Sequence, residues 1–377
     1  MRIFITSLFA HIFLNSYIGW RVWHALPPKK GWRVPMVALI VMEVLLYGTI
    51  YIFRDTLPDN VMYIGGGICL IWLIAMVYFT IILMSLDLMR LIHRRWPIYP
   101  KWATKHYLLT KQFLLICSVL IVGTAVYNGY RNGETPIVKE VKLTVKKESP
   151  AHKTLKIAVA SDWHIGHITR KKEAQNIVRM INSQHPDIIL LPGDIIDHDL
   201  HIAHTQKIDE DLRELNAPLG VYAVMGNHEY RGWPDAKIRW LEKSGITLLI
   251  DSVASPDGTF YLIGRDDFTN EERRKSMREL TRGVDTSKPI IVIDHQPERF
   301  SIDESTREEV DIAFYGHTHG GQIWPHNVLI HLFKPFVYGY RKTGNTHHYV
   351  TSGIGMAGPP LRIGSRSEIT VATVTFK

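Results

Sequence analysis

The sequence predicts an α/β protein with two sheets packed between helices, preceded by an all-α bundle of about four transmembrane helices. Two observations support this prediction. The first third of the chain consists of long apolar runs that carry almost no charge. From Leu155 onward, short apolar runs typical of strands alternate with amphipathic runs typical of helices, and the ends of this region, Ile137–Val145 and Glu368–Phe376, alternate apolar and polar residues.

Residues 1–130 are predicted to be a transmembrane helical region. Each apolar run has about the 20 residues needed to cross a bilayer, and helices of a soluble bundle would instead show a charged stripe. The first run contains His11 and Asn15, so an uncleaved signal anchor is an alternative there. Glu43 lies in mid-span, and we expect it to pair with a neighbouring helix. The four runs are Ile3–Trp23, Val34–Phe53, Met62–Leu91 and Tyr107–Tyr127.

The positive charge of the chain belongs entirely to this first region. Residues 1–130 carry 12 Lys and Arg against 4 Asp and Glu, whereas the remainder is balanced at 32 of each. This distribution argues against a nucleic-acid partner. The basic loops follow the first and third runs, so these loops should face the cytoplasm, and the C-terminal domain should be extracytoplasmic. The two cysteines, Cys69 and Cys117, lie in apolar runs and exclude a disulfide framework or a Cys-rich zinc site.

The rest of the chain divides into a connecting segment and one domain. Residues 128–135 have the composition of a polar linker, and 131–154 should hold that linker and an edge strand. The domain then covers 155–377. Its predicted helices are Lys171–Ser183, Gln206–Leu215, Asp235–Ser244, Glu271–Arg282 and Pro297–Ser305. Its predicted strands are Lys156–Ala160, Asp187–Leu191, Val221–Met225, Thr247–Ile250, Phe260–Gly264, Pro289–Ile293 and Val310–Tyr315.

Five of these strands end in side chains that are typical metal ligands. Ligands in α/β sheets collect beyond the carboxyl ends of strands, so we expect these side chains to converge. Carboxylate, amide and imidazole donors without thiolate favour two divalent ions of Mn, Fe or Zn over Ca. The candidate metal ligands are Asp162, His164, Asp194, Asn227, His295, His317 and His319.

The order of these motifs resembles the calcineurin-like metallophosphoesterase superfamily. Its pattern of Asp-x-His, Gly-Asp, Gly-Asn-His-Glu/Asp, a lone His and Gly-His-x-His is complete over residues 162–319. The segments 319–322 and 358–362 are similar to those of its membrane-attached bacterial branch. The resemblance implies a two-sheet αββα sandwich. It also implies two metal ions that share Asp194, with His228 protonating the leaving oxygen or stabilising the transition state. One ion would be held by Asp162, His164, Asp194 and His319, and the other by Asp194, Asn227, His295 and His317.

The implied protein is a multi-pass, membrane-anchored enzyme that hydrolyses a phosphate ester or pyrophosphate bond with a metal-bound hydroxide. Its partners would be the membrane and a phosphorylated small molecule or lipid. A non-catalytic membrane sensor or scaffold that keeps the same fold is the alternative function.

Several other polar residues are expected to have no role in the site. Asp197 and Asp266 could orient a ligand histidine, but turn or surface positions are the simpler interpretation. The remaining histidines of interest are expected to be solvated, with a third metal as the alternative for the first three. They are His198, His201, His204, His347 and His348.

Overall fold

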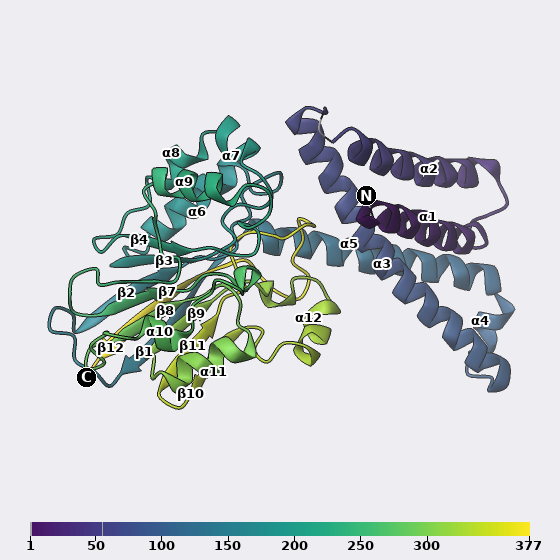
Figure 1. The fold of residues 1–377 in the computed structure, drawn as a ribbon. Helices are drawn as coiled ribbons and strands as arrows, with labels where there is room; N and C mark the ends of the chain where they lie inside the picture. The colour runs from purple at the N-terminus through teal and green to yellow at the C-terminus, as the bar shows by residue number, and fades with distance from the viewer. Residues whose placement is uncertain (1, 55) are drawn as a thin grey trace. The chain divides into compact units, whose positions relative to one another are not determined.

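The computed structural model describes residues 2–54 and 56–377 and divides the chain into two compact units (Figure 1). The first unit is Met1–Asn128 and the second is Gly129–Lys377. All four predicted apolar runs lie in helices. Within the described residues, three of these helices, α2, α3 and α5, are long and apolar enough to cross a membrane. The helices are α1 (Arg2–Trp23), α2 (Lys30–Ile52), α3 (Asp59–Arg95), α4 (Lys101–Lys105) and α5 (Tyr107–Glu134).

Glu43 on α2 is paired with α1, as expected. Its carboxylate lies 2.7 Å from His11 Nδ1 and accepts a 2.7 Å hydrogen bond from Asn15 Nδ2. Trp72 Nε1 on α3 donates to Asn15 Oδ1 at 3.2 Å. An acid in an apolar bundle is costly unless it is paired. The polar residues that make the first run less apolar than the others are therefore the partners of this acid.

The second unit contains two six-stranded sheets that pack face to face. One sheet has the order β1-β12-β2-β3-β4-β5 and the other β10-β11-β9-β8-β7-β6. The strands of the first are β1 (Ile137–Val145), β2 (Thr154–Val159), β3 (Ile188–Pro192), β4 (Val221–Val224), β5 (Thr247–Leu248) and β12 (Glu368–Phe376). Those of the second are β6 (Ser252–Ala254), β7 (Tyr261–Gly264), β8 (Ile290–Ile293), β9 (Ile312–Tyr315), β10 (Gly339–Thr343) and β11 (Thr346–Val350).

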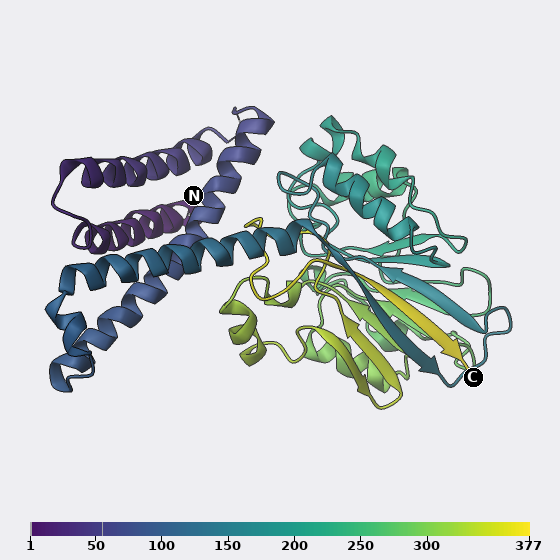
Figure 2. The same ribbon diagram turned by 180° about the vertical axis from the view of Figure 1, so that it is seen from behind.

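Helices cover the outer face of each sheet, which gives the predicted αββα order (Figure 2). α6 (Lys171–Asn182), α8 (Ile208–Leu212) and α9 (Pro234–Lys243) pack on the first sheet. α10 (Met277–Leu280) and α11 (Arg299–Arg307) pack on the second. Successive residues of β3 alternate between the core under the helices and the core between the sheets. Both faces of this strand are buried, which explains its continuous apolar sequence.

The predicted linker at residues 128–135 is wrong, because α5 continues as a helix to Glu134. Gly129 and Gly133 lie one turn apart, and added Cβ atoms there would collide with Ile363 and Met356. The carbonyl of Gly129 also accepts a 2.8 Å hydrogen bond from the backbone N–H of Arg362. Close packing of the two glycines against this loop offsets their low helix propensity.

Two other predicted helices are shorter than expected. The segment Glu271–Arg282 forms only α10, because the preceding turn directs Arg274 inward to an ion pair with Asp294 at 2.6 Å. The segment Gln206–Leu215 forms only α8, which begins after Lys207 adopts a left-handed conformation with φ of 52°. The short elements β6, β10, α7 (His201–Thr205) and α12 (His326–Leu329) carry no strong periodicity and were not predicted. A strand was expected after His348, and β11 instead begins at Thr346 and includes both histidines.

His347 and His348 are buried in β11, which contradicts the expected exposure. Two residues in succession can both be buried because both faces of β11 are covered: Tyr349 packs in the core between the sheets and Val350 in the core under α10 and α11. His348 Nε2 lies 3.2 Å from Thr306 Oγ1, and burial lowers the pKa of His348 to about 4.

This burial predicts a pH dependence of stability. The folded protein keeps His348 neutral down to about pH 4, whereas the unfolded chain binds a proton near the ordinary pKa of 6.5. The contribution of neutral His348 to the free energy of unfolding is therefore complete above pH 6.5. This contribution falls by at most about 3 kcal/mol as the pH decreases toward 4. Thermal unfolding of the wild type and of His348→Gln should show a stability difference that narrows over this range. A constant difference would contradict the prediction.

Candidate metal centre

All seven predicted ligand residues lie together at the carboxyl ends of β2, β3, β4, β8 and β9. The first three strands run parallel to one another in one sheet, and the last two run parallel in the other. Both sheets therefore deliver polar side chains to one edge of the sandwich. This convergence is the geometry that the sequence predicted.

The backbone at the site adopts an uncommon conformation. Ten non-glycine residues in the described part of the chain have positive φ, and five of them are predicted ligands. Such conformations cost of order 1–3 kcal/mol each and persist where the surroundings fix them, often at functional sites. The five are Asp162, His164, Asp194, His317 and His319.

Asp162, His164 and His319 form the first group of converging donors. The Nε2 atoms of His164 and His319 are 3.0 Å apart, and His319 Nε2 lies 3.6 Å from Asp162 Oδ1. Asp194 Oδ2 lies 3.9 Å from His164 Nε2. All four side chains are at least 90% buried.

Asp194, His295 and His317 form the second group, which Asn227 joins. His295 Nε2 lies 3.2 Å from Asp194 Oδ2 and 3.1 Å from Asn227 Oδ1. His317 Nδ1 lies 3.0 Å from the same Asn227 oxygen. Asp194 therefore faces both groups.

The protonation of His295 indicates what fits between these atoms. Its Nδ1 donates a 2.8 Å hydrogen bond to the carbonyl of Pro192, so Nε2 is the ring nitrogen that faces the site and would carry the lone pair when the ring is neutral. That lone pair faces the oxygens of Asp194 and Asn227, which are also acceptors. These acceptors repel one another unless a positive charge lies between them, either a proton on His295 Nε2 or a metal ion that replaces it. The donors are thus suited to bind divalent metal.

The electrostatics of the site favour the ligand forms of Asp194, His317 and His319. Burial would raise the pKa of Asp194, but His295 and other neighbouring histidines hold it well below its usual range. Burial, with the neighbouring charge of His295, lowers the pKa of His317 to about 3. Burial and the nearby Arg362 also lower the pKa of His319. Metal ligation needs ionised carboxylates and neutral imidazoles, and these three shifts favour those forms. The other shifts go the opposite way: burial raises the pKa of Asp162, and, against the effect of burial, Asp197 raises the pKa of His164 and Asp194 raises the pKa of His295. A metal ion bound among these side chains would displace those protons.

His228 lies beside the two groups, presents its Nε2 to them and, with His164 and Asp194, forms a third set of converging side chains. This atom is 4.0 Å from Asp194 Oδ2, and 12% of the side chain is exposed. The other ring nitrogen, Nδ1, lies 2.9 Å from Asp197 Oδ1 and 2.8 Å from the Asp197 carbonyl. Asp197 Oδ1 also lies 3.4 Å from His164 Nδ1. The expectation that Asp197 is a simple turn acid was therefore wrong.

Glu229 and Arg362 belong to the site, although sequence reasoning gave them no role. Glu229 is fully buried and accepts the backbone N–H groups of Asp194, Ile196 and Gly226 at 2.7–2.8 Å. It thereby joins the loops that follow β3 and β4, and its burial raises its pKa to about 7. The only sequence signal for a role of Glu229 in the site was its position directly after Gly226-Asn227-His228.

Arg362 supports the opposite side of the site. It is fully buried and donates to His319 Nδ1 at 3.1 Å and to the His319 carbonyl at 3.2 Å. Its guanidinium also donates to the carbonyls of Ser352 and Gly355. Arg362 lies 43 residues beyond His319, so nothing local in the sequence indicates this contact.

The other polar residues considered lie outside the metal groups. His198, His201 and His204 are exposed, as expected. Asp266 is buried and accepts hydrogen bonds from Tyr230 and Asn270, which contradicts the expected surface position.

Comparisons with known proteins agree with this geometry. The family model for calcineurin-like phosphoesterases matches residues 155–321. An uncharacterized metallophosphoesterase of Helicobacter pylori strain J99 is 31% identical over 69% of this chain and 70% of its own length. The chain belongs to the calcineurin-like phosphoesterase family.

Two further proteins are similar to this chain. The zebrafish (Danio rerio) "transmembrane protein with metallophosphoesterase domain" is 29% identical over 91% of this chain and 80% of its own length. The structure of Haemophilus influenzae NAD nucleotidase (NadN) covers 55% of this chain and 46% of its own, at 17% identity and a TM-score of 0.38. The protein described here has apolar helices long enough to cross a membrane and clustered metal-ligand side chains. It is therefore a membrane-associated phosphoesterase that binds divalent metal.

The contacts of Asp197 predict a positioning role. Asp197→Asn should lower metal affinity or kcat by roughly 10–100-fold, because the charge that orients His164 and His228 is lost. Metal titration and steady-state kinetics on the full-length protein measure the two effects. Asp199→Asn is the matched control, because Asp199 is exposed on the same loop and should behave as wild type. Equal behaviour of both variants would contradict the assignment.

Proposed function

We propose that the protein is a dinuclear, metal-dependent phosphoesterase anchored in the cell membrane by several helices. The observation that carries the proposal is the position of Asp194 between two groups of converging donors. One ion would be held by Asp162, His164, Asp194 and His319, and the other by Asp194, Asn227, His295 and His317. Imidazole and oxygen donors suit Mn, Fe or Zn.

The bound ions would supply charge neutralisation of the phosphate and an activated water nucleophile. The protein's own residues would perform the remaining steps. His228 would donate a proton from Nε2 to the leaving oxygen, on the side of the site where its ring is partly exposed. Asp197 would hold Nδ1 and so keep Nε2 directed at the substrate. Glu229 and Arg362 would fix the loops that carry the ligands.

Hydrolysis of a chromogenic phosphodiester with added Mn²⁺ tests this proposal. Asp194→Ala should abolish activity, since it removes a donor from both groups. His228→Gln should lower kcat by about 10²–10⁴-fold while metal binding is retained. His204→Gln is the matched control on an exposed helix. Metal binding without hydrolysis of any phosphate ester would instead favour the non-catalytic scaffold.

We further propose that the catalytic domain is extracytoplasmic. Basic residues concentrate in the segments 21–33 and 90–105, which flank the apolar helices, and such segments remain in the cytoplasm. With four spans, both termini of the chain then lie on the extracytoplasmic side of the membrane. The test is a phosphatase reporter that is active only after export from the cytoplasm. Fused after Lys377, this reporter should be active. Activity of a cytoplasmic reporter at that position would reverse the assigned orientation.

The proposed substrate is a phosphate ester or pyrophosphate, and a lipid-linked one accords with the membrane helices. A substrate panel on the purified protein separates the possibilities. Preferential cleavage of soluble nucleotides would exclude the lipid substrate.

A further inference from the structure

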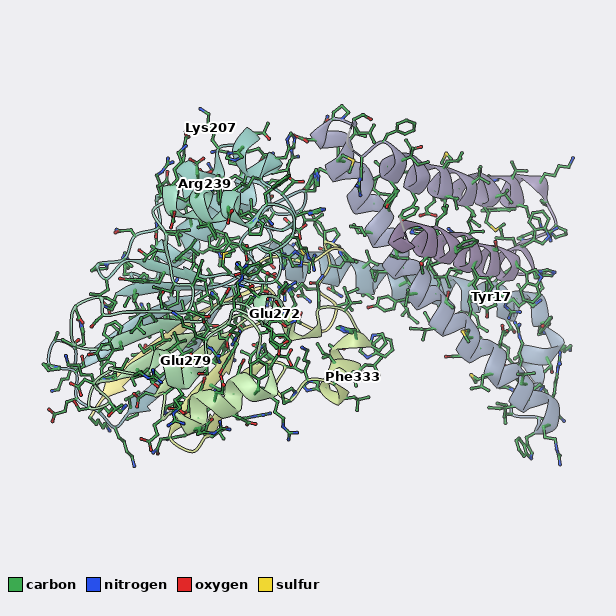
Figure 3. All side chains as sticks on the ribbon, in the orientation of Figure 1. Tyr17, Lys207, Arg239, Glu272, Glu279 and Phe333 are labelled. Carbon is green, nitrogen blue, oxygen red and sulfur yellow. The ribbon has the colours of Figure 1, made fainter. Side chains whose placement is uncertain are left out.

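The segment 323–333, which we call the apolar lobe, follows the metal-site residue His319 and carries exposed apolar side chains. It contains α12 and the short turn η3 (Ile330–Leu332) at the edge of the second unit (Figure 1). Phe333 lies at its outer end (Figure 3). Soluble surfaces seldom gather so many large apolar groups in one short segment. The exposed fractions are Trp324 45%, Val328 57%, Leu329 48%, Leu332 76% and Phe333 82%.

The apolar lobe forms one wall of a pocket that opens onto the metal centre. This cavity of about 470 Å³ is lined by His317 and His319 on one side and by His326 and Ile330 of the lobe on the other. A molecule that reaches the metal-site histidines through this pocket therefore passes the lobe.

The lobe is held firmly in its exposed position. His326 Nδ1 lies 3.1 Å from the carbonyl of Gly321, and the backbone N–H of Trp324 donates to the carbonyl of Ile363. Lys334, just beyond the lobe, pairs with Glu298. These contacts fix the backbone of the lobe in a position that leaves its apolar side chains exposed.

The neighbourhood of the lobe identifies a lipid bilayer as its partner. Ile363 also contacts Gly129 of α5, and α5 is one of the helices able to cross a membrane. The end of that helix and the lobe are therefore attached to the same loop. α5 ends at Glu134 and β1 begins at Ile137, so no long linker separates this domain from the helix.

The residues that follow the lobe match the chemistry of a membrane surface. Arg341 lies 4.4 Å above the ring of Phe336, and Arg341 and Lys342 are exposed. Tyr338 and Tyr340 are 43% and 49% exposed. Basic side chains attract anionic headgroups, and exposed Tyr and Trp favour the membrane–water interface.

We propose that the apolar lobe inserts into the interfacial layer of the bilayer and presents the pocket to lipid headgroups. This proposal rests on the proposed phosphoesterase function and assigns its substrate class as the phosphate of a membrane lipid. The alkyl chains of the substrate stay in the bilayer beside Leu332 and Phe333. The phosphate enters the pocket between the lobe and His317.

Fluorescence in lipid nanodiscs that hold one full-length copy tests the insertion. A nitrobenzoxadiazole probe is attached at Phe333→Cys after Cys69 and Cys117 are replaced by Ala. Its emission should shift to shorter wavelength and be quenched by doxyl-labelled lipid. The same probe at Arg239→Cys, an exposed position on the outer side of α9, should show neither effect. Equal quenching at both positions would overturn the proposal. The emission could instead shift only when a disc holds two copies, without quenching by doxyl lipid. That result would show that the lobe contacts a second copy of the protein and not the bilayer.

A matched pair of substrates separates this inference from the proposed function. The pair is hexadecyl p-nitrophenyl phosphate in phosphatidylcholine–phosphatidylglycerol nanodiscs and soluble methyl p-nitrophenyl phosphate. Leu332→Ser combined with Phe333→Ser should lower kcat/KM for the hexadecyl substrate by about tenfold or more, because two inserted side chains are lost. Hydrolysis of the methyl substrate should not change.

Val253→Ser is the matched control, because Val253 is 40% exposed on the edge strand β6 and should leave both rates unchanged. If the wild type hydrolyses neither substrate, the phosphoesterase function itself is wrong. If it hydrolyses both and the lobe variant changes neither rate, only the membrane role of the lobe is wrong.

Discussion

The carboxylate of Asp194 is the constraint around which the catalytic unit is arranged. One oxygen accepts the backbone N–H of His228, and the other faces His164 and His295. Because this carboxylate is buried, its charge must be compensated, either by protonated histidines beside it or by a metal ion that replaces their protons. Glu229 accepts the backbone N–H of Asp194 and so fixes its position. The left-handed conformations of Asp162, Asp194 and His317 are maintained by the same dense set of contacts.

The two units handle buried charge in different ways. In the helical unit, Glu43 is satisfied by His11 and Asn15, so its hydrogen-bonding capacity is used within the protein. In the catalytic unit, the oxygens of Asp194 and Asn227 face the Nε2 atom of His295, and together these groups form a set of potential ligands for an external cation. The first arrangement stabilises helix packing, whereas the second leaves the side chains available to bind metal.

The αββα fold and the convergence of the seven candidate ligands could be predicted because their signals are local. Each ligand follows a short apolar strand, and a parallel strand places its carboxyl end at a defined edge. The roles of Asp197 and Arg362 could not be read in this way, since their contacts with His228 and His319 arise only from tertiary folding. The burial of His348 likewise depends on which strands flank β11.

The continuity of α5 has a practical consequence for dissecting the protein. The boundary between the two units falls at Asn128 and Gly129, inside a helix. Its last turns cover Ile363 and Met356 and accept the N–H of Arg362. A fragment cut after this helix would leave that apolar loop uncovered, so a water-soluble catalytic fragment has to retain residues from Gly129 onward.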